Sequence, residues 1–159
     1  MRAVLGIDAA WTSTNPSGVA LMAEYPDGWR LISVSPSYKH FQGMAENRPL
    51  TNERPSGSIP DAVVLLASAA ALGGGNVDLV AIDMPLALTP IVGRRASDNA
   101  VSREYGARKC GTHTPSALRP GRVSDDLREA FDQAGYPLLT TAIAPPGVIE
   151  VYPHPALVE

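Results

Sequence analysis

The chain has 159 residues and a net charge of −3, so its length suits one domain with a core of its own and its charge excludes binding a polyanion by bulk attraction alone. Its hydrophobic content of 45% and charged content of 18% are those of an ordinary globular protein. Cys110 is the only cysteine, which excludes an intrachain disulfide and fits a reducing cytosol.

The apolar runs argue against a membrane protein. Asp8 interrupts the first run, which argues against a signal peptide. The longest run, 62–72, is far shorter than the ~20 residues that span a bilayer. We therefore expect a soluble, cytoplasmic protein that does not contact a membrane.

The first predicted element is a strand over 3–7, a nearly continuous apolar run of the kind that is covered on both faces. Asp8 follows at its end. A carboxylate at the tip of a buried strand is costly unless a backbone N–H, a basic side chain or a metal ion pairs with it. Asp8 is therefore a candidate ligand, or alternatively a cap of the following turn. Thr12 and Ser13 could bind a phosphate oxygen or cap the same turn.

Two further strands follow after turn signals, over 19–23 and 29–34. Two short links between three strands predict an antiparallel meander. The segment 35–57 is polar, rich in Pro, Asn and Ser, and has no clear period, so we predict a long loop that is either a lid or a mobile connection. His40 within it is expected to be solvated.

A helix is predicted over 62–72, apolar on nearly every side and ended by the glycine run 73–75. It precedes a strand over 78–83. Because a helix connects them, this strand can lie parallel to the first one. The strand ends in Asp83, just as the first strand ends in Asp8.

The remaining predicted elements are a helix over 97–105 capped by Ser97, a helix capped by Ser124, and short strands over 138–143 and 148–152. The last strand carries Glu150. In open α/β sheets, ligands gather outside the carboxyl ends of the strands. If the three acid-bearing strands are neighbours, Asp8, Asp83 and Glu150 converge on one hard-cation site.

The window 94–122 is strongly basic. It holds seven of the 13 Lys and Arg residues and two acids, which leaves it at +5. The seven are Arg94, Arg95, Arg103, Arg108, Lys109, Arg119 and Arg122. We expect the window to lie on the same side as the acids, to be partly mobile, and to clamp phosphate through Arg94, Arg95 or Arg103. The alternative is a solvated face with local ion pairs.

The order of elements, with the first strand central, resembles the RNase H-like fold, an α/β fold with a mixed sheet and flanking helices. Four phrases strengthen the likeness: Gly6–Trp11, Ala81–Leu86, Ile149–Pro155, and Arg95–Asp98 followed by Arg103 and Gly106. Together they resemble the uncharacterised family of predicted nucleases with an RNase H-like fold. The likeness covers most of 1–159 as a single domain, and the helix turn that stops at 155–159 indicates a truncated form of a longer domain.

The resemblance implies a Mg²⁺- or Mn²⁺-dependent phosphodiesterase acting on nucleic acid or another phosphodiester. Asp8 and Asp83 match the acids that hold the metals in this fold, and Glu150 matches the family's Glu before a Tyr/His-Pro segment. The implied catalytic residues are Asp8, Asp83, Glu150 and His154, of which the three acids are also the metal ligands. The implied substrate-binding residues are Thr12, Arg94, Arg95, Asp98 and Arg103.

The chemistry of the residues agrees with that implication. Cations held by shared carboxylates supply a nucleophilic water and stabilise charge on the phosphorane. Oxygen ligands select Mg²⁺ or Mn²⁺, and the lack of a Cys pair or a His-x-x-x-His spacing argues against zinc. His113 and His154 are candidates for proton transfer to the leaving oxygen, although His154 could instead shape its Pro-His-Pro turn.

Two other functions stay open at this point. One is a non-catalytic binding or assembly domain that keeps the fold. The other is an actin-like or sugar-kinase-like nucleotide-binding unit, which shares a first strand ending in Asp. That unit would need a Gly-rich phosphate loop after the first strand, for which Gly18 alone is a poor substitute.

Overall fold

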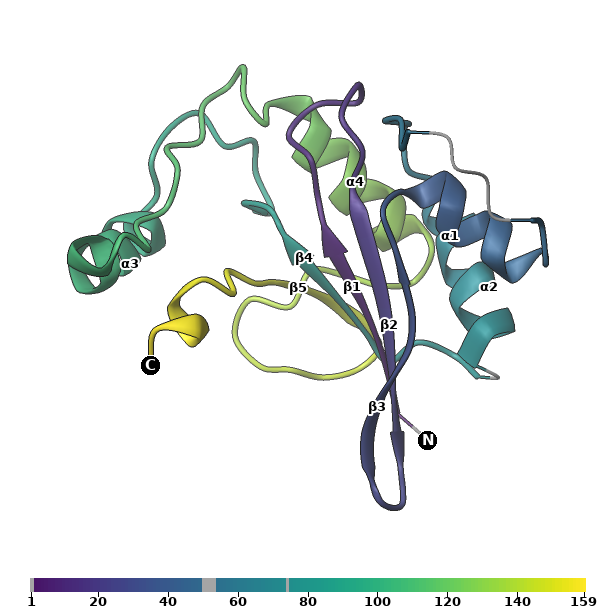
Figure 1. Cartoon of the computed structure of the whole chain (residues 1–159). Helices are drawn as coiled ribbons and strands as arrows, with labels where there is room; N and C mark the ends of the chain where they lie inside the picture. The colour runs from purple at the N-terminus through teal and green to yellow at the C-terminus, as the bar shows by residue number, and fades with distance from the viewer. Residues whose placement is uncertain (1, 50–53, 74) are drawn as a thin grey trace.

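The fold is built on a five-stranded mixed sheet, seen in a computed structural model that describes residues 2–49, 54–73 and 75–159 (Figure 1). Its strands are β1 (Ala3–Asp8), β2 (Gly18–Tyr25), β3 (Gly28–Ser35), β4 (Leu79–Asp83) and β5 (Gly147–Glu150), in the order β3-β2-β1-β4-β5. β3, β2 and β1 pair antiparallel, whereas β1, β4 and β5 pair parallel. The predicted α/β class, with a meander, parallel strands and a central first strand, is confirmed, and the topology is consistent with the RNase H-like fold.

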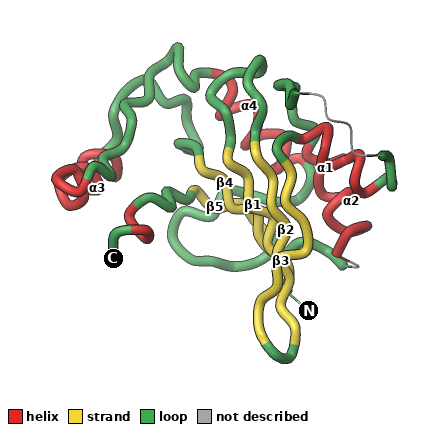
Figure 2. The backbone as a smooth tube through the Cα atoms, viewed as in Figure 1, coloured by secondary structure: helices red, strands yellow, loops and turns green. Residues whose placement is uncertain are grey.

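Four helices accompany the sheet in the described part of the chain: α1 (Tyr38–Ala45), α2 (Ala62–Gly73), α3 (Ala96–Tyr105) and α4 (Arg122–Gln133). Short 3-10 turns, η1 and η2, cover Gly106–Arg108 and Pro155–Leu157. α1, α2 and α4 pack beside the sheet, whereas α3 stands apart from it (Figures 1 and 2). Across the described ranges, no helix combines the length and the apolar character needed to cross a membrane.

The hydrophobic core lies between one face of the sheet and α1, α2 and α4. Leu5 and Ile7 of β1 face this core, and their neighbours Val4 and Gly6 alternate onto the other face, where they are partly buried. The expectation that the first strand is covered on both faces is therefore wrong. The three packed helices all lie on one side of the sheet. The side chain of the acid at the tip of β1 is therefore on the opposite, more open face.

A helix, α1, occupies part of the segment predicted to be a long loop over 35–57. Ser37 caps it by accepting the backbone N–H of His40, and the His40 ring also contacts the Ser37 hydroxyl at 2.8 Å. Tyr38 and Phe41 are buried against the core. One turn of apolar spacing after a serine cap was the signal for this helix, and the surrounding polar residues masked it. Residues 50–53 of the predicted loop, and Gly74 of the predicted glycine run, lie outside the described residues.

Two smaller expectations also need correction. Residues 138–143 form no strand, because only Leu138 makes a bridge, with Val148 of β5. α4 begins at Arg122 rather than after Ser124, whose hydroxyl instead donates to the carbonyl of Gly121 within the first turn.

Replacing Phe41 with alanine tests whether α1 is part of the core. Phe41 is fully buried, so Phe41→Ala should lower the free energy of unfolding by about 3–5 kcal/mol. Lys39→Ala, on the exposed side of the same helix, should change it by less than about 0.5 kcal/mol. Urea denaturation measures both. Equal, small effects would contradict the packing of α1 and favour the loop.

Candidate active site

Two carboxylates lie side by side at the carboxyl ends of β1 and β4. Asp8 and Asp83 are register partners in these parallel strands, which are neighbours about 4.8 Å apart. Alternation along each strand puts both side chains on the face opposite the core, together with the preceding pair Gly6 and Ala81. The structure thus brings two of the predicted site residues together, and their role as metal ligands stays a prediction.

Neither acid of this pair forms an ion pair with a side chain that the structure describes. Asp8 and Asp83 take part in none of the ion pairs formed within the described ranges. Burial and then the charge of Asp8 raise the pKa of Asp83 above its ordinary value, while His154 opposes this and Glu150 adds to it. The charges of the two carboxylates repel each other, so a cation taken from solution would stabilise them.

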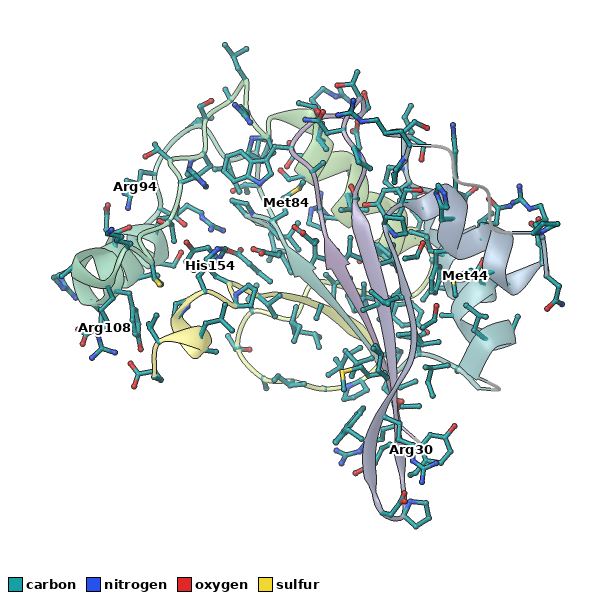
Figure 3. The ribbon with its side chains drawn as sticks, viewed as in Figure 1. Arg30, Met44, Met84, Arg94, Arg108 and His154 are labelled. Carbon is teal, nitrogen blue, oxygen red and sulfur yellow. The ribbon has the colours of Figure 1, made fainter. Side chains whose placement is uncertain are left out.

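The acid pair opens into a cavity of about 700 Å³, called the acid cavity below. Its walls come from the segments after β1, β4 and β5 and from residues 94–121, which we call the arm. In Figure 3, Arg94 marks the arm and His154 marks the segment after β5. The predicted basic window therefore lies on the same side of the molecule as the acid pair, and its mobility stays a prediction.

Arg95 joins the arm to the sheet. Its guanidinium donates to both carboxylate oxygens of Glu150, at 2.6 Å each, and to those of Asp98, at 2.8 and 3.1 Å. It also donates to the carbonyl of Leu86 at 2.9 Å. Asp98 is only 3% exposed and accepts the backbone N–H of Arg95, so Asp98 and Arg95 cap α3 where Ser97 was predicted to do so.

The contacts between Arg95 and Asp98 shift the pKa of that carboxyl. Burial by itself would raise the pKa of Asp98, but the hydrogen bonds and charge of Arg95 outweigh it and hold that pKa below its ordinary value. The hydrogen bonds that Arg95 donates to Glu150 are the main cause that raises the pKa of Arg95. Asp98 is therefore ionised across the physiological pH range, opposite the guanidinium of Arg95.

Glu150 belongs to this cluster more than to the acid pair. Its register partner on β4 is Ile82, a core residue, and its carboxylate accepts the backbone N–H of Leu86 at 2.9 Å besides the bonds from Arg95. In residues 2–49, 54–73 and 75–159, no group of three or more acidic, His or Cys side chains is positioned to hold a metal ion. The three-acid convergence is not found, and a metal role for Glu150 stays a prediction.

Arg94 is held inside the arm. Its guanidinium donates to the side chains of Asn99, Ser102, Thr112 and Thr114 and to the backbone carbonyls of Asp98 and Thr112. These bonds fasten the loop after α3 onto the helix. Arg95 is likewise bound to two carboxylates. Either guanidinium would therefore lose protein contacts if it turned to bind a substrate.

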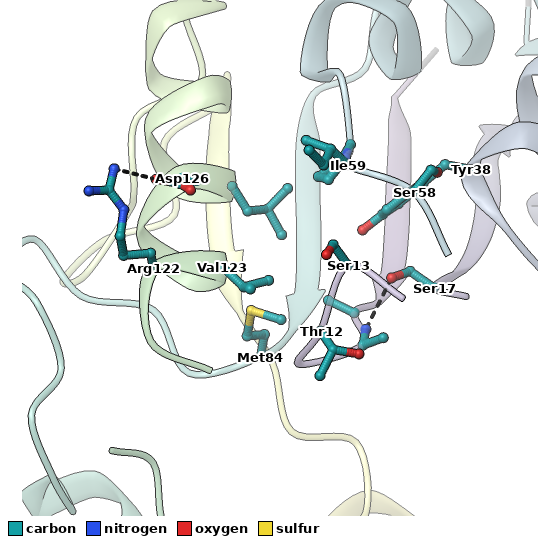
Figure 4. Close-up of a pocket in the computed structure, with 14 residues that line it drawn as sticks. Thr12, Ser13, Ser17, Tyr38, Ser58, Ile59, Met84, Arg122, Val123 and Asp126 are labelled. Atoms are coloured by element: carbon teal, nitrogen blue, oxygen red, sulfur yellow. Dashed lines mark hydrogen bonds and ion pairs between the residues drawn. The ribbon is translucent and has the colours of Figure 1, made fainter. Parts of the chain in front are cut away.

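The remaining predicted substrate residues lie outside the acid cavity. Arg103 is exposed on α3 and does not line it. Thr12 accepts the backbone N–H of Asn15 at 3.3 Å, which is the turn-capping alternative. Thr12 lines a smaller cavity of about 220 Å³ with Ser13 and Met84 (Figure 4).

Two aromatic pairs line the acid cavity. Trp11 and His113 meet edge to face with ring centroids 6.0 Å apart, and Tyr152 and His154 stack at 5.1 Å. The Tyr152 hydroxyl donates to the carbonyl of Gly111 at 3.0 Å and so fastens the arm to the segment after β5. Trp11 and Tyr152 each follow an acid closely in the sequence, and that spacing was the only signal for them.

Sequence reasoning also missed which cations line the acid cavity without an ion-pair partner. Lys109 and Arg119 line the acid cavity, are exposed, and form none of the ion pairs in the described part of the chain. Both were inside the predicted basic window. Nothing in the sequence separated them from Arg94 and Arg95, whose partners only the fold assembles.

No family model, no curated protein and no solved structure matches the chain. The sheet topology is nevertheless consistent with the RNase H-like fold. The topology and the geometry of the acid cavity are therefore the observations from which a function can be inferred, because a fold by itself carries many functions.

Removing the cation of the Arg95 cluster should destabilise the protein. Arg95→Gln leaves Asp98 buried without its charge partner, and we expect a loss toward the lower end of ~3–5 kcal/mol because Glu150 is partly exposed. Arg95→Lys should recover only part of this, since an ammonium cannot reproduce the forked bonds. Arg103→Gln, exposed on the same helix, is the control. Urea unfolding measures all three, and equal stabilities for Arg95→Gln and the control would contradict the role.

Replacing Asp83 should stabilise the metal-free protein in a pH-dependent way. The pKa of Asp83 is raised in the folded state above its ordinary 3.8, so the wild type loses stability as pH rises from that value through the raised one. In EDTA, Asp83→Asn should therefore gain free energy of unfolding relative to wild type as the pH is raised from about 3 to about 7. Asp132→Asn, an exposed acid of α4, is the control. A gain that is the same at every pH would contradict the ionised Asp83 carboxylate, destabilised by burial and by Asp8, as its cause.

Proposed function

We propose that the acid cavity hydrolyses phosphodiester bonds with a divalent cation, Mg²⁺ or Mn²⁺, held by Asp8 and Asp83. The observation that carries the proposal is an acid pair in register at the carboxyl ends of two parallel strands, with no ion-pair partner among the described residues. Proteins hold Mg²⁺ through one or two carboxylates, while water and substrate phosphate complete its octahedron. A set of two carboxylates therefore fits this ion, and the third acid that sequence reasoning added is not required.

Each residue of the cavity has a distinct task in such a reaction. The cation, when bound, supplies a more acidic water and stabilises charge on the phosphorane. Asp8 and Asp83 fix its position. His154, whose charge lowers the pKa of Asp83 and which lines the same cavity, holds a proton for the leaving oxygen.

Glu150 and Arg95 contribute to this reaction by positioning. Leu86 lies three residues beyond Asp83 on the connector that leaves β4, and its backbone N–H and carbonyl bind Glu150 and Arg95 respectively. The connector is thereby held at both the backbone N–H and the backbone carbonyl of Leu86. This keeps Asp83 at the rim of the cavity and gives Glu150 a function without metal coordination.

The proposal is tested by metal binding and by hydrolysis. Wild-type protein should bind Mn²⁺ in a calorimeter and release p-nitrophenol from bis(p-nitrophenyl) phosphate when Mn²⁺ is present. Asp8→Asn and Asp83→Asn should each lose Mn²⁺ binding and lower the rate at least about 10²-fold, the scale of removing one charge-stabilising group. Asp132→Asn makes the same chemical change on α4 and should leave both measurements unchanged.

Two results would contradict the proposal in different ways. Absence of Mn²⁺ binding by the wild type would remove the metal site. Mn²⁺ binding that depends on Asp83, without hydrolysis of the small phosphodiester or of single-stranded or duplex nucleic acid, would favour a non-catalytic binding domain.

A further inference from the structure

We propose that the acid cavity takes a phosphodiester whose flanking bases are unpaired, with Lys109 and Arg119 as phosphate contacts and the rings of Trp11 and His154 as stacking surfaces. This inference rests on the proposed function, because the acid pair fixes where the reacting phosphate lies. It names the substrate class of that site and two cations that sequence reasoning did not assign.

The aromatic rings come from the segments after two strands, β1 and β5, that lie on either side of β4. Trp11 belongs to the segment after β1, and His154 to the segment after β5, with β4 and Asp83 between these strands. Trp11 and His113 form an edge-to-face pair, in which the ring that presents its edge has both faces free of its partner. Tyr152 and His154 form a stacked pair, in which the outer face of each ring is free of its partner. Trp11 also packs partly against the core, and all four rings line the cavity. The cavity wall therefore carries aromatic rings after both β1 and β5, which is the kind of surface on which single-strand binding sites stack bases.

The two cations are the ones that remain available to a phosphate. The guanidinium N–H groups of Arg94 and Arg95 already donate to protein acceptors. Lys109 and Arg119 line the same cavity, are exposed, and form none of the ion pairs within the described residues. A chain at −3 needs such local charge to hold a polyanion beside two carboxylates.

The size of the cavity separates unpaired from paired substrates. About 700 Å³ lies within the roughly 300–1,000 Å³ of sites that enclose one small molecule. Aromatic side chains reach a base only when its π-face is uncovered, and in a duplex each face is covered by the neighbouring pair. A dinucleotide, or the unpaired stretch of a longer strand, presents the required chemistry, and a duplex does not.

The two tryptophans of the chain provide a direct reporter. Trp29 lies on β3, opposite Glu24 and at the far end of the sheet from Asp8. In the variant Trp29→Phe, Trp11 is therefore the only tryptophan and reports from the cavity wall. Adding Asp83→Asn prevents turnover and removes one repelling charge, so binding is measured without hydrolysis.

This double variant is titrated with thymidylyl-thymidine, with a short oligothymidylate and with a blunt duplex. The dinucleotide and the single strand should quench Trp11 fluorescence saturably, and the single strand should bind about 5- to 150-fold more tightly than the duplex, the range of one aromatic stack. Saturation by the oligomer but not by the dinucleotide shows that the phosphodiester taken by the cavity belongs to a longer single strand. Absence of quenching, or equal affinity for the duplex, overturns the inference.

The salt dependence of oligothymidylate binding tests the two cations. Lys109→Gln and Arg119→Gln should each lower the slope of log affinity against log salt by about 0.7, the value for one single-strand phosphate contact. Arg103→Gln, an exposed cation of α3 outside the cavity, is the matched control and should not change the slope. Unchanged slopes for both Lys109→Gln and Arg119→Gln overturn their assignment.

Failure of the inferred substrate class can be distinguished by experiment from failure of the proposed function. Quenching by single strands, with no hydrolysis by the wild type in Mn²⁺, leaves the binding inference standing and removes the reaction. Hydrolysis by the wild type, together with equal binding of duplex and single strand, keeps the reaction and overturns the substrate class.

Discussion

The guanidinium of Arg95 is the contact on which the geometry of the cavity depends. It donates to Asp98 on α3, to Glu150 at the end of β5, and to the carbonyl of Leu86 after β4. Three separate segments are therefore tied together by one planar group, whose fork matches a carboxylate in a way that an ammonium cannot. α3 buries no apolar side chain, so its position relative to the sheet depends on these polar contacts.

The cavity thus contains acids in two opposite electrostatic situations. Asp98 and Glu150 both form ion pairs with Arg95, which fixes the positions of their carboxylates. Asp8 and Asp83 lie next to each other with no ion-pair partner among the described residues. Burial and then the charge of Asp8 raise the pKa of Asp83, which costs the folded protein stability when Asp83 is ionised. Uncompensated like charges are a violation of the usual rules of stability, and such violations gather at functional sites.

The strand order and the acid pair were predictable because both depend on local pattern. An apolar run that ends in Asp, repeated after a crossover helix, predicts adjacent carboxyl ends. Glu150 was assigned to the same pair because the sequence does not specify that it lies beside Ile82 and not beside Asp83. Arg94 and Arg95 look as available as Lys109 in the sequence, since their acceptors come from residues up to 55 positions away.

Because polar contacts fasten α3 while an apolar core fastens the other three helices, we expect α3 to open as a weaker cooperative unit than the rest of the molecule. The backbone amides of α3 should then exchange with solvent through local opening, at a lower free energy than global unfolding. The acid cavity lies on the boundary between the units, so any molecule that fills it acts as a cross-link. Occupancy would slow exchange in a helix whose own sequence contributes little to holding it in place.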